Sequence, residues 1–200
     1  MKNIKKILFV ALFGLLTFSS FAANMKDTEK AKNGQEFMEI FMTNTEYEPR
    51  YLAWQNSVKN MDSEEKANVD AEAEKLLQTK TSGEVKYKTK DGTLIMSSKI
   101  ENGKPVSMTM YDKSGAITTV SQGQITIFYR NGKDAVVTKS NEIDPSKGFS
   151  KPEAATGEIY YSNGILAGKS DPKEGHIIFY HKNGKPFFEL KKGWDKEKRY

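Results

Sequence analysis

The two histidines of this chain are the residues best suited to acid–base or metal chemistry, because imidazole titrates near neutral pH and binds zinc. His176 and His181 both lie in residues 175–184, and the chain has no other histidine and no cysteine. They are an odd number of positions apart, so on a regular strand their side chains would point to opposite faces of a sheet. This spacing argues against a zinc centre, and we expect no metal and no other cofactor.

A second candidate for catalysis is Ser63-Glu-Glu-Lys66, which matches the Ser-x-x-Lys acylating motif of penicillin-binding enzymes. The companion motifs Ser-Asp-Asn and Lys-Thr-Gly are missing, and residues 80–83 (Lys-Thr-Ser-Gly) only approximate the latter. The same residues are typical of a helix start, because Asp62 is an N-cap acceptor that Glu65 follows three residues later. We therefore interpret the segment as a capped helix. Neither a Gly-x-Ser-x-Gly elbow nor a Gly-rich phosphate loop occurs in the sequence.

Carboxylates are plentiful in the first half, but Glu64, Glu65, Glu72 and Glu74 fall on the expected solvent-exposed face of a helix. A pair of acids for glycan hydrolysis would have to be brought together by the fold, since nothing local indicates one. We predict that the chain is not an enzyme. The alternative of a cell-wall or glycan hydrolase that uses Asp or Glu remains open.

Basic residues near the C-terminus form the best candidate binding surface. Residues 83–200 carry twenty Lys or Arg against fourteen Asp or Glu, whereas residues 23–82 carry eight against twelve. A basic surface tipped by an aromatic ring would suit an anionic lipid or a cell-wall polymer. An ordinary solvated terminus, or attraction to the acidic first half, would explain the same residues. The predicted surface consists of Lys182, Lys185, Lys191, Lys192, Trp194, Lys198 and Arg199.

The N-terminus has the pattern of a secretory signal peptide. Lys2, Lys5 and Lys6 precede an apolar run over residues 7–18, and the small residues Ser20 and Ala22 flank Phe21. The run is shorter than the roughly 20 residues of a membrane-spanning helix. We expect residues 1–22 to be removed and the protein to be exported, either periplasmic or secreted, with no transmembrane segment after cleavage. The net charge of +5 includes the three signal-peptide lysines and does not suggest a nucleic-acid partner.

Residues 23–82 have helical periodicity. Phe37, Ile40 and Phe41 form one apolar stripe. Pro49 stands where a second helix could begin, and a third follows Asp62. The apolar faces predicted for the second and third helices comprise Tyr51, Leu52, Trp54 and Val58, and then Val69, Ala73, Leu76 and Leu77. We predict two or three short helices.

From Gly83 onward the apolar period changes to two, with β-branched and aromatic residues that are typical of half-buried strands. Asp-Gly and Asn-Gly dipeptides tolerate the positive φ of tight hairpins. Residues 141–156, by contrast, have the composition of a longer loop. The predicted turns are Asp91-Gly92, Asn102-Gly103, Ser114-Gly115, Asn131-Gly132, Asn163-Gly164 and Asn183-Gly184. The fold class is thus α+β, with short N-terminal helices followed by an antiparallel meander of β-hairpins.

Aligning the turns exposes an internal repeat. Residues 83–92, 123–132 and 175–184 share a first Gly, a Val or Ile two residues later, an aromatic, and a closing Asp/Asn-Gly; residues 157–164 are a shortened copy. A fifth turn, at residues 111–115, keeps only the aromatic and the final Gly. We interpret the aromatics as repeat core. The predicted structural residues are Gly83, Gly92, Gly123, Tyr129, Gly132, Gly157, Tyr161, Gly164, Gly175, Tyr180 and Gly184.

The histidines align with positions that vary between copies. His176 corresponds to Glu84 or Gln124, and the offset from the turn places His181 with Thr89 or Arg130. We therefore expect both histidines to be exposed and incidental.

The repeated Gly-x-Ile-x-x-Tyr-x-x-Asn-Gly-Lys pattern resembles the bacterial variant of MORN repeats, short Gly- and Tyr-rich β-hairpins. The resemblance implies an elongated stacked sheet; some bacterial members are antitoxin-like, and eukaryotic relatives are linked to membranes and scaffolding. The usual Gly-x-Trp-x-x-Tyr form is absent, and the turn spacing is irregular. The resulting division is a signal peptide at 1–22, a helical region at 23–82, repeats at 83–192 and a basic tail at 193–200.

The combined expectation is an exported, non-enzymatic repeat protein that binds or scaffolds a cell-envelope protein or an anionic polymer. An extracytoplasmic antitoxin-like or immunity-like binder is an alternative that the resemblance leaves open.

Overall fold

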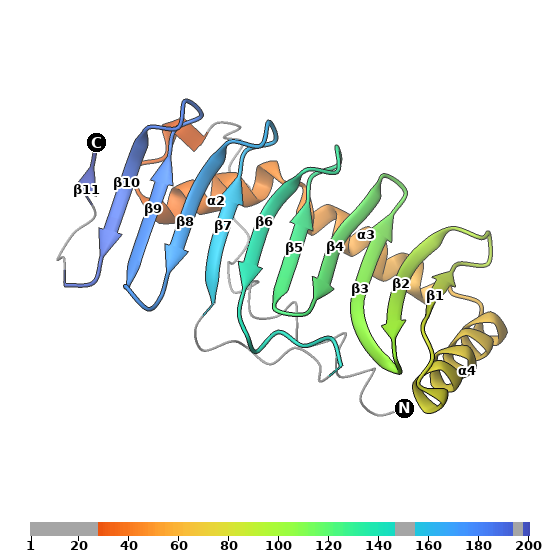
Figure 1. The fold of residues 1–200 in the computed structure, drawn as a ribbon. Coiled ribbons are helices and arrows are strands. Elements are labelled where there is room, and N and C mark those ends of the chain that lie inside the picture. The colour runs from red at the N-terminus through yellow and green to blue at the C-terminus, as the bar shows by residue number, and fades with distance from the viewer. Residues whose placement is uncertain (1–27, 147–154, 194–197) are drawn as a thin grey trace.

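The computed structural model describes residues 28–146, 155–193 and 198–200, in which helices precede an 11-stranded antiparallel sheet (Figure 1). The helices are η1 (Thr28–Lys30), α2 (Gly34–Asn44), α3 (Tyr47–Lys59) and α4 (Ser63–Thr79). The strands are β1 (Gly83–Lys88), β2 (Leu94–Glu101), β3 (Lys104–Asp112), β4 (Gly115–Ser121), β5 (Gln124–Phe128), β6 (Asp134–Lys139), β7 (Thr156–Tyr160), β8 (Leu166–Asp171), β9 (His176–Tyr180), β10 (Pro186–Lys191) and β11 (Lys198–Arg199). Each strand pairs with its neighbours in the chain, so the predicted α+β hairpin meander is confirmed. The predicted signal peptide and Trp194 lie outside the described residues.

Two of the helices begin at side-chain caps. The Asn33 carboxamide accepts from the Glu36 backbone N–H at 2.9 Å, and α2 buries the predicted apolar stripe. The Asp62 carboxylate accepts from the backbone N–H groups of Glu64 and Glu65 at 2.9 and 3.0 Å. These bonds satisfy donors that the first helical turn leaves free. The interpretation of residues 62–65 as a helix start is thereby confirmed.

The predicted buried face of α3 is partly wrong. Trp54 is buried, but the Leu52 side chain is 51% exposed, and Arg50 takes the inward position instead with 2% exposed. Pro49 is the third residue of this helix rather than the first. It is tolerated there because the first-turn N–H groups have no partner within the helix.

The helices cover one face of the sheet and run against the chain order of the strands (Figure 1). The Phe37 ring of α2 lies 4.8 Å from that of Phe179 in β9, whereas Trp54 of α3 donates from Nε1 to the Ile95 carbonyl of β2 at 2.8 Å. At the far end, the Tyr87 hydroxyl of β1 donates to Asp70 of α4 at 3.0 Å. The helices therefore follow one another from β9 towards β1, and the strands follow one another in the opposite direction.

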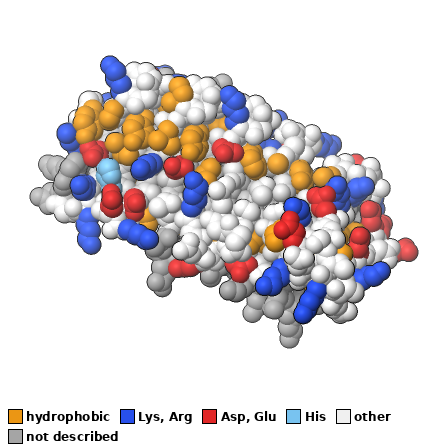
Figure 2. All heavy atoms as spheres, in the orientation of Figure 1, with side chains coloured by type: hydrophobic (Ala, Val, Ile, Leu, Met, Phe, Trp, Pro, Cys, Tyr) orange, Lys and Arg blue, Asp and Glu red, His pale blue; other side chains and the backbone are white. Residues whose placement is uncertain are grey.

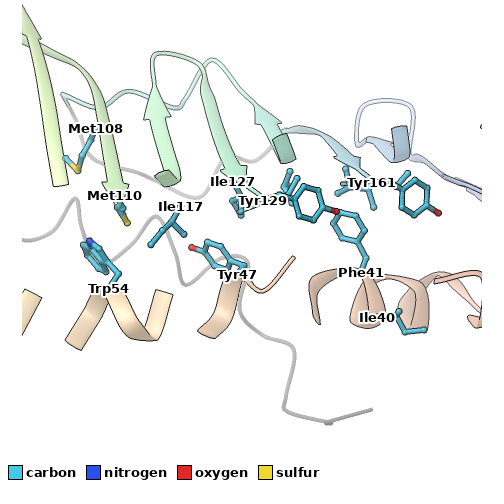
Figure 3. Close-up of a cluster of buried hydrophobic side chains, with 14 of the residues drawn as sticks. Ile40, Phe41, Tyr47, Trp54, Met108, Met110, Ile117, Ile127, Tyr129 and Tyr161 are labelled. Carbon is cyan, nitrogen blue, oxygen red and sulfur yellow. The ribbon is translucent and has the colours of Figure 1, made fainter. Parts of the chain in front are cut away.

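The core lies between these helices and the sheet. Figure 3 shows Trp54 beside Met108 and Met110, and Tyr47 facing Ile117 and Ile127. These side chains come from helix and strand segments that are far apart in the sequence, so the helices and the sheet form one continuous hydrophobic core.

All six predicted turns connect consecutive strands, and four share one hydrogen-bond pattern. In the turn at Gly132, Tyr129 N–H donates to the Lys133 carbonyl at 2.9 Å and Gly132 N–H donates to the Tyr129 carbonyl at 2.9 Å. The turns at Gly92, Gly164 and Gly184 repeat both bonds. Two further connections, at residues 122–123 and 172–175, were not predicted.

A β-bulge accompanies each repeated hairpin and alters the simple alternation of faces. As a result two successive residues after the turn are buried, which strict period-two reasoning does not predict. The buried pairs are Ile95 and Met96, Ile117 and Thr118, Ala135 and Val136, Ala167 and Gly168, and Phe187 and Phe188.

Substitution of Gly103 by alanine is expected to destabilise the protein more than the same change at Gly164. Both residues have positive φ, +73° and +92°, so each variant carries about 1–2 kcal/mol of backbone strain. A Cβ at Gly103 would also lie 2.7 Å from Lys80 Cα, whereas one at Gly164 would meet nothing within 4 Å. Urea denaturation should give Gly103→Ala an additional loss of about 1–3 kcal/mol. Equal losses would contradict the close approach of α4 to this turn.

Candidate binding face of the sheet

The sheet has two chemically different faces. We call the face that packs against α2 and α3 the inner face, and the opposite one the outer face. Strand alternation assigns residues to each, and the strand register places equivalent residues of successive hairpins in rows across the sheet. Each hairpin unit spans two strands, so equivalent positions recur about 9–10 Å apart.

One row of the inner face occupies the position three residues before the turn glycines Gly92, Gly115, Gly132, Gly164 and Gly184. It consists of Thr89, Asp112, Tyr129, Tyr161 and His181. The Tyr129 hydroxyl donates to the Tyr160 carbonyl at 2.7 Å, and the Tyr161 hydroxyl donates to the Tyr180 carbonyl at 2.7 Å. Each tyrosine thus links its hairpin to the next one. We call this row, with its hydrogen bonds, the inner ladder. Burial raises the pKa of Tyr129 to about 12, which keeps its hydroxyl protonated and able to donate.

Arg50 completes this ladder in the second unit, where Asp112 replaces the tyrosine. The guanidinium bonds both Asp112 oxygens, with Nε–Oδ2 at 2.7 Å and Nη2–Oδ1 at 3.2 Å. It also donates to the carbonyls of Phe128 at 2.8 Å and Ala116 at 2.9 Å. Arg50 therefore links the β3–β4 hairpin to the β5–β6 hairpin, as Tyr129 and Tyr161 link the hairpins that follow. Sequence reasoning missed it, although an aspartate at the tyrosine position of the weakest repeat was a usable signal.

The charge of Asp112 is stabilised in the folded state. Burial alone would raise its pKa, but hydrogen bonds from Arg50 and Ser114 outweigh burial and lower the pKa to about 2. The carboxylate is therefore ionised wherever the protein is folded near neutral pH, which is what an arginine partner requires.

The prediction that both histidines are exposed is wrong. His181 aligns with Tyr129 and Tyr161 rather than with Arg130; its ring centroid lies 4.3 Å from that of Phe187, and Nδ1 lies 3.9 Å from Glu29 Oε1. His176 lies on the outer face with Nε2 2.9 Å from Glu189 Oε1. Both are half-buried beside a carboxylate. Within residues 28–146, 155–193 and 198–200, no three His, Asp or Glu side chains are grouped to hold a metal ion.

Removing the Tyr129 hydroxyl tests the ladder. Tyr129→Phe leaves the Tyr160 carbonyl without this donor and should lower the free energy of unfolding by about 1–3 kcal/mol. Tyr180→Phe is the matched control, because that hydroxyl belongs to the outer face. We expect the control to change stability by less than about 0.5 kcal/mol in thermal or urea unfolding. Equal effects would show that the inner-face hydroxyl bond contributes nothing specific.

A row of aromatic side chains crosses the outer face, and each of its members directly precedes a residue of the inner ladder in the chain. Its members are Tyr111, Phe128, Tyr160 and Tyr180, all half-buried. Tyr180 was predicted to share the core role of Tyr129 and Tyr161, but it lies on the opposite face from them, and His181 takes the equivalent inner position. Figure 2 views this side and shows hydrophobic side chains gathered over β7–β10 and continuing as a narrower band along the sheet.

Hydrogen bonds fix the orientation of two of these rings. The Tyr160 hydroxyl donates to Glu158 Oε2 at 2.9 Å, and burial together with this carboxylate raises the Tyr160 pKa to about 12. The Tyr111 hydroxyl lies 3.3 Å from the Ser97 hydroxyl. The rings are therefore held in place on the outer face.

Short hydroxyl side chains form the next row. Ser97, Thr109, Thr119 and Thr126 are direct cross-strand neighbours. The Thr109 and Thr119 hydroxyls are 2.9 Å apart, and the Gln124 carboxamide donates to Thr126 at 2.9 Å. A third row continues with Ser107, Ser121 and Gln124. The outer positions of β3–β5 in these three rows thus carry no charged side chain; we call this area the uncharged patch.

A hollow with charges of both signs lies beside the uncharged patch, over β6, β7 and β8. Lys139 Nζ is 3.7 Å from Glu158 Oε2 within it. Glu158 also holds Tyr160, so the hollow and the aromatic row share a residue. The hollow is lined by Val137, Lys139, Thr156, Gly157, Glu158, Lys169, Ser170 and Asp171.

The predicted basic surface is not assembled as one patch. Lys182 and Lys185 lie at the β9–β10 turn, whereas Lys191 and Lys192 lie at the other end of β10, about 20 Å away at the rise of a strand. Lys198 and Arg199 form β11 beside β10, and the Arg199 guanidinium sits 5.4 Å from the Phe188 ring. The structure therefore divides the six described basic residues among three places.

Comparison with known proteins found no family model that matches the chain and no curated protein that is similar in sequence. Among the described residues, the helices are too short or too polar for any of them to cross a membrane.

Proposed function

We propose that this chain is an exported, non-enzymatic repeat protein of the MORN-like type, and that it binds a cell-envelope partner through the outer face of its sheet. The observation that carries the proposal is the difference between the two faces. The inner face is covered by α2 and α3 and linked by buried hydrogen bonds, whereas the outer face presents an ordered aromatic row beside uncharged hydroxyls (Figure 2).

The geometry of the outer face supports binding rather than turnover. Glu158, which lies beside the aromatic row, bonds the Tyr160 hydroxyl and faces Lys139, which fits a positioning role. Aromatic rings combine a large contact area with few rotatable bonds, so the row loses little conformational entropy when a ligand binds, least of all at Tyr111 and Tyr160, whose hydroxyls are already bonded. The export signal expected at residues 1–22 would bring this face to the cell envelope.

Cosedimentation with envelope fractions tests the proposal. The purified protein should pellet with isolated cell walls or with envelope membranes, and Phe128→Ser combined with Tyr160→Ser should abolish pelleting. Leu52→Ser is the matched control, because Leu52 is exposed on α3 away from the outer face. Retention of the double variant, or no pelleting of the unaltered protein with any envelope fraction, would refute the proposal.

A further inference from the structure

We propose that the ligand of the outer face is an uncharged, extended β-1,4-linked polysaccharide that lies across the strands along the aromatic row. This inference rests on the proposed function and adds to it the chemical class and direction of the ligand. The carrying observation is the side-by-side arrangement of the aromatic row, Tyr111, Phe128, Tyr160 and Tyr180, and the hydroxyl row, Ser97, Thr109, Thr119 and Thr126.

Spacing is the first argument. Neighbouring strands are about 4.8 Å apart, which is close to the advance per sugar in an extended β-1,4-linked chain. A strand of such a glycan laid across the sheet would place one sugar over each strand. The aromatic rings recur every second strand, so alternate sugars would stack on Tyr111, Phe128, Tyr160 and Tyr180. The negative face of an aromatic ring attracts the C–H face of a sugar ring.

The hydroxyl row is the second argument. Thr109 and Thr119 already bond each other, and Gln124 bonds Thr126, so these groups are oriented rather than free to rotate. A protein partner with an apolar contact surface would desolvate them without supplying hydrogen bonds, which is unfavourable. A polysaccharide brings donors and acceptors on every residue. The polar floor beside the rings therefore favours a glycan over a peptide surface.

Charge is the third argument. The outer positions of β3–β5 carry no charged side chain, and in the neighbouring hollow Lys139 and Lys169 are balanced by Glu158 and Asp171. Beside the aromatic row, the charged residue opposite Phe128 is the acidic Asp134. An anionic polymer would need a cationic track along its path. The basic residues expected to supply such a track lie at the β9–β10 turn, at the end of β10 and on β11. A neutral chain suits the face as it is built.

The inference is tested with soluble β-1,4-linked oligosaccharides of glucose and of N-acetylglucosamine, from two to eight sugars long, by calorimetric titration. Affinity should rise with chain length and then level off. Phe128→Ala and Tyr160→Ala should each weaken binding about ten-fold, equivalent to 1.4 kcal/mol. Leu52→Ala should bind as the unaltered protein does. Raising salt from about 0.05 to 0.5 M, which shortens the Debye length, should leave affinity unchanged.

The outcomes separate this inference from the proposed function. If oligosaccharides of every length fail to bind while envelope fractions still retain the protein through Phe128 and Tyr160, the glycan assignment is wrong and the outer face binds something else. Binding to anionic vesicles that salt abolishes would likewise replace the neutral chain by a charged surface. Far-UV circular dichroism and unfolding midpoints of the variants show that any lost binding is not lost folding.

Discussion

Replacement of Arg50 by methionine is expected to lower the free energy of unfolding by about 3–5 kcal/mol, because it leaves a buried charge and two carbonyls without their donor. Arg50 is 2% exposed, and its guanidinium bonds Asp112 and the carbonyls of Phe128 and Ala116. Methionine fills a similar volume, so packing is largely kept and the loss reports the hydrogen bonds. Chemical denaturation monitored by Trp fluorescence would measure it.

The pH dependence of the same variant identifies the cause. The pKa of Asp112 is lowered to about 2 in the folded protein from 3.8. A depressed folded-state pKa adds stability above the unfolded pKa, and this stability is lost as the pH falls from about 4 toward 2. Arg50→Met should flatten this acid limb of the stability curve. Arg50→Met combined with Asp112→Ala should cost less than the two single losses added together. Additive losses would show that the two side chains are not coupled.

Phe37→Ala is expected to lower the free energy of unfolding by about 3–5 kcal/mol, because it empties the contact between α2 and the last strands. The Phe37 side chain is fully buried, with ring centroids 4.8 Å from Phe179 and 6.2 Å from Phe187. The same measurement on Leu52→Ala provides the control, since that side chain is 51% exposed and should lose less than about 0.5 kcal/mol. A small effect of Phe37→Ala would mean that α2 is not held against β9 and β10.

The hairpins could be predicted from the sequence because their signals are local. Asn-Gly and Asp-Gly set the turn geometry within a few residues, and the helix stripe of Phe37, Ile40 and Phe41 is an equally local pattern. The caps at Asn33 and Asp62 obey the same principle. Each of these features depends on residues that are neighbours in the chain.

Features that depend on distant residues were missed. The bulge after each turn places two successive residues in the core, which strict alternation does not predict. Tyr180 and His181 lie before the turn, and His181 rather than Tyr180 stands three residues before the turn glycine, as Tyr129 and Tyr161 do. Arg50 and Asp112 are 62 positions apart, and no spacing rule connects them. The basic residues near the C-terminus are close in sequence but are separated in space, since β10 lies between Lys185 and Lys192.

The outer face could not be recognised before the register was known. Ser97, Thr109, Thr119 and Thr126 are unremarkable in the sequence, and only strand pairing places them side by side. Once the strand register is known, comparing equivalent positions of neighbouring strands identifies these rows. The glycan inference depends on that cross-strand order.

The opposed directions of helices and strands bear on how the chain is made. Phe37, in the first long helix, contacts the rings of Phe179 in β9 and Phe187 in β10, so an apolar side chain that is synthesised early is covered by the last hairpin. Hairpins can add to the sheet one after another as the chain emerges, and Phe41 of α2 lies beside Tyr129 of the third hairpin (Figure 3), but Phe37 meets no ring of the sheet until β9 and β10 are made. A chain cut short before β9 would leave Phe37 exposed and prone to association, as partly folded chains with uncovered apolar surface are. Completion of the fold thus depends on completion of the chain.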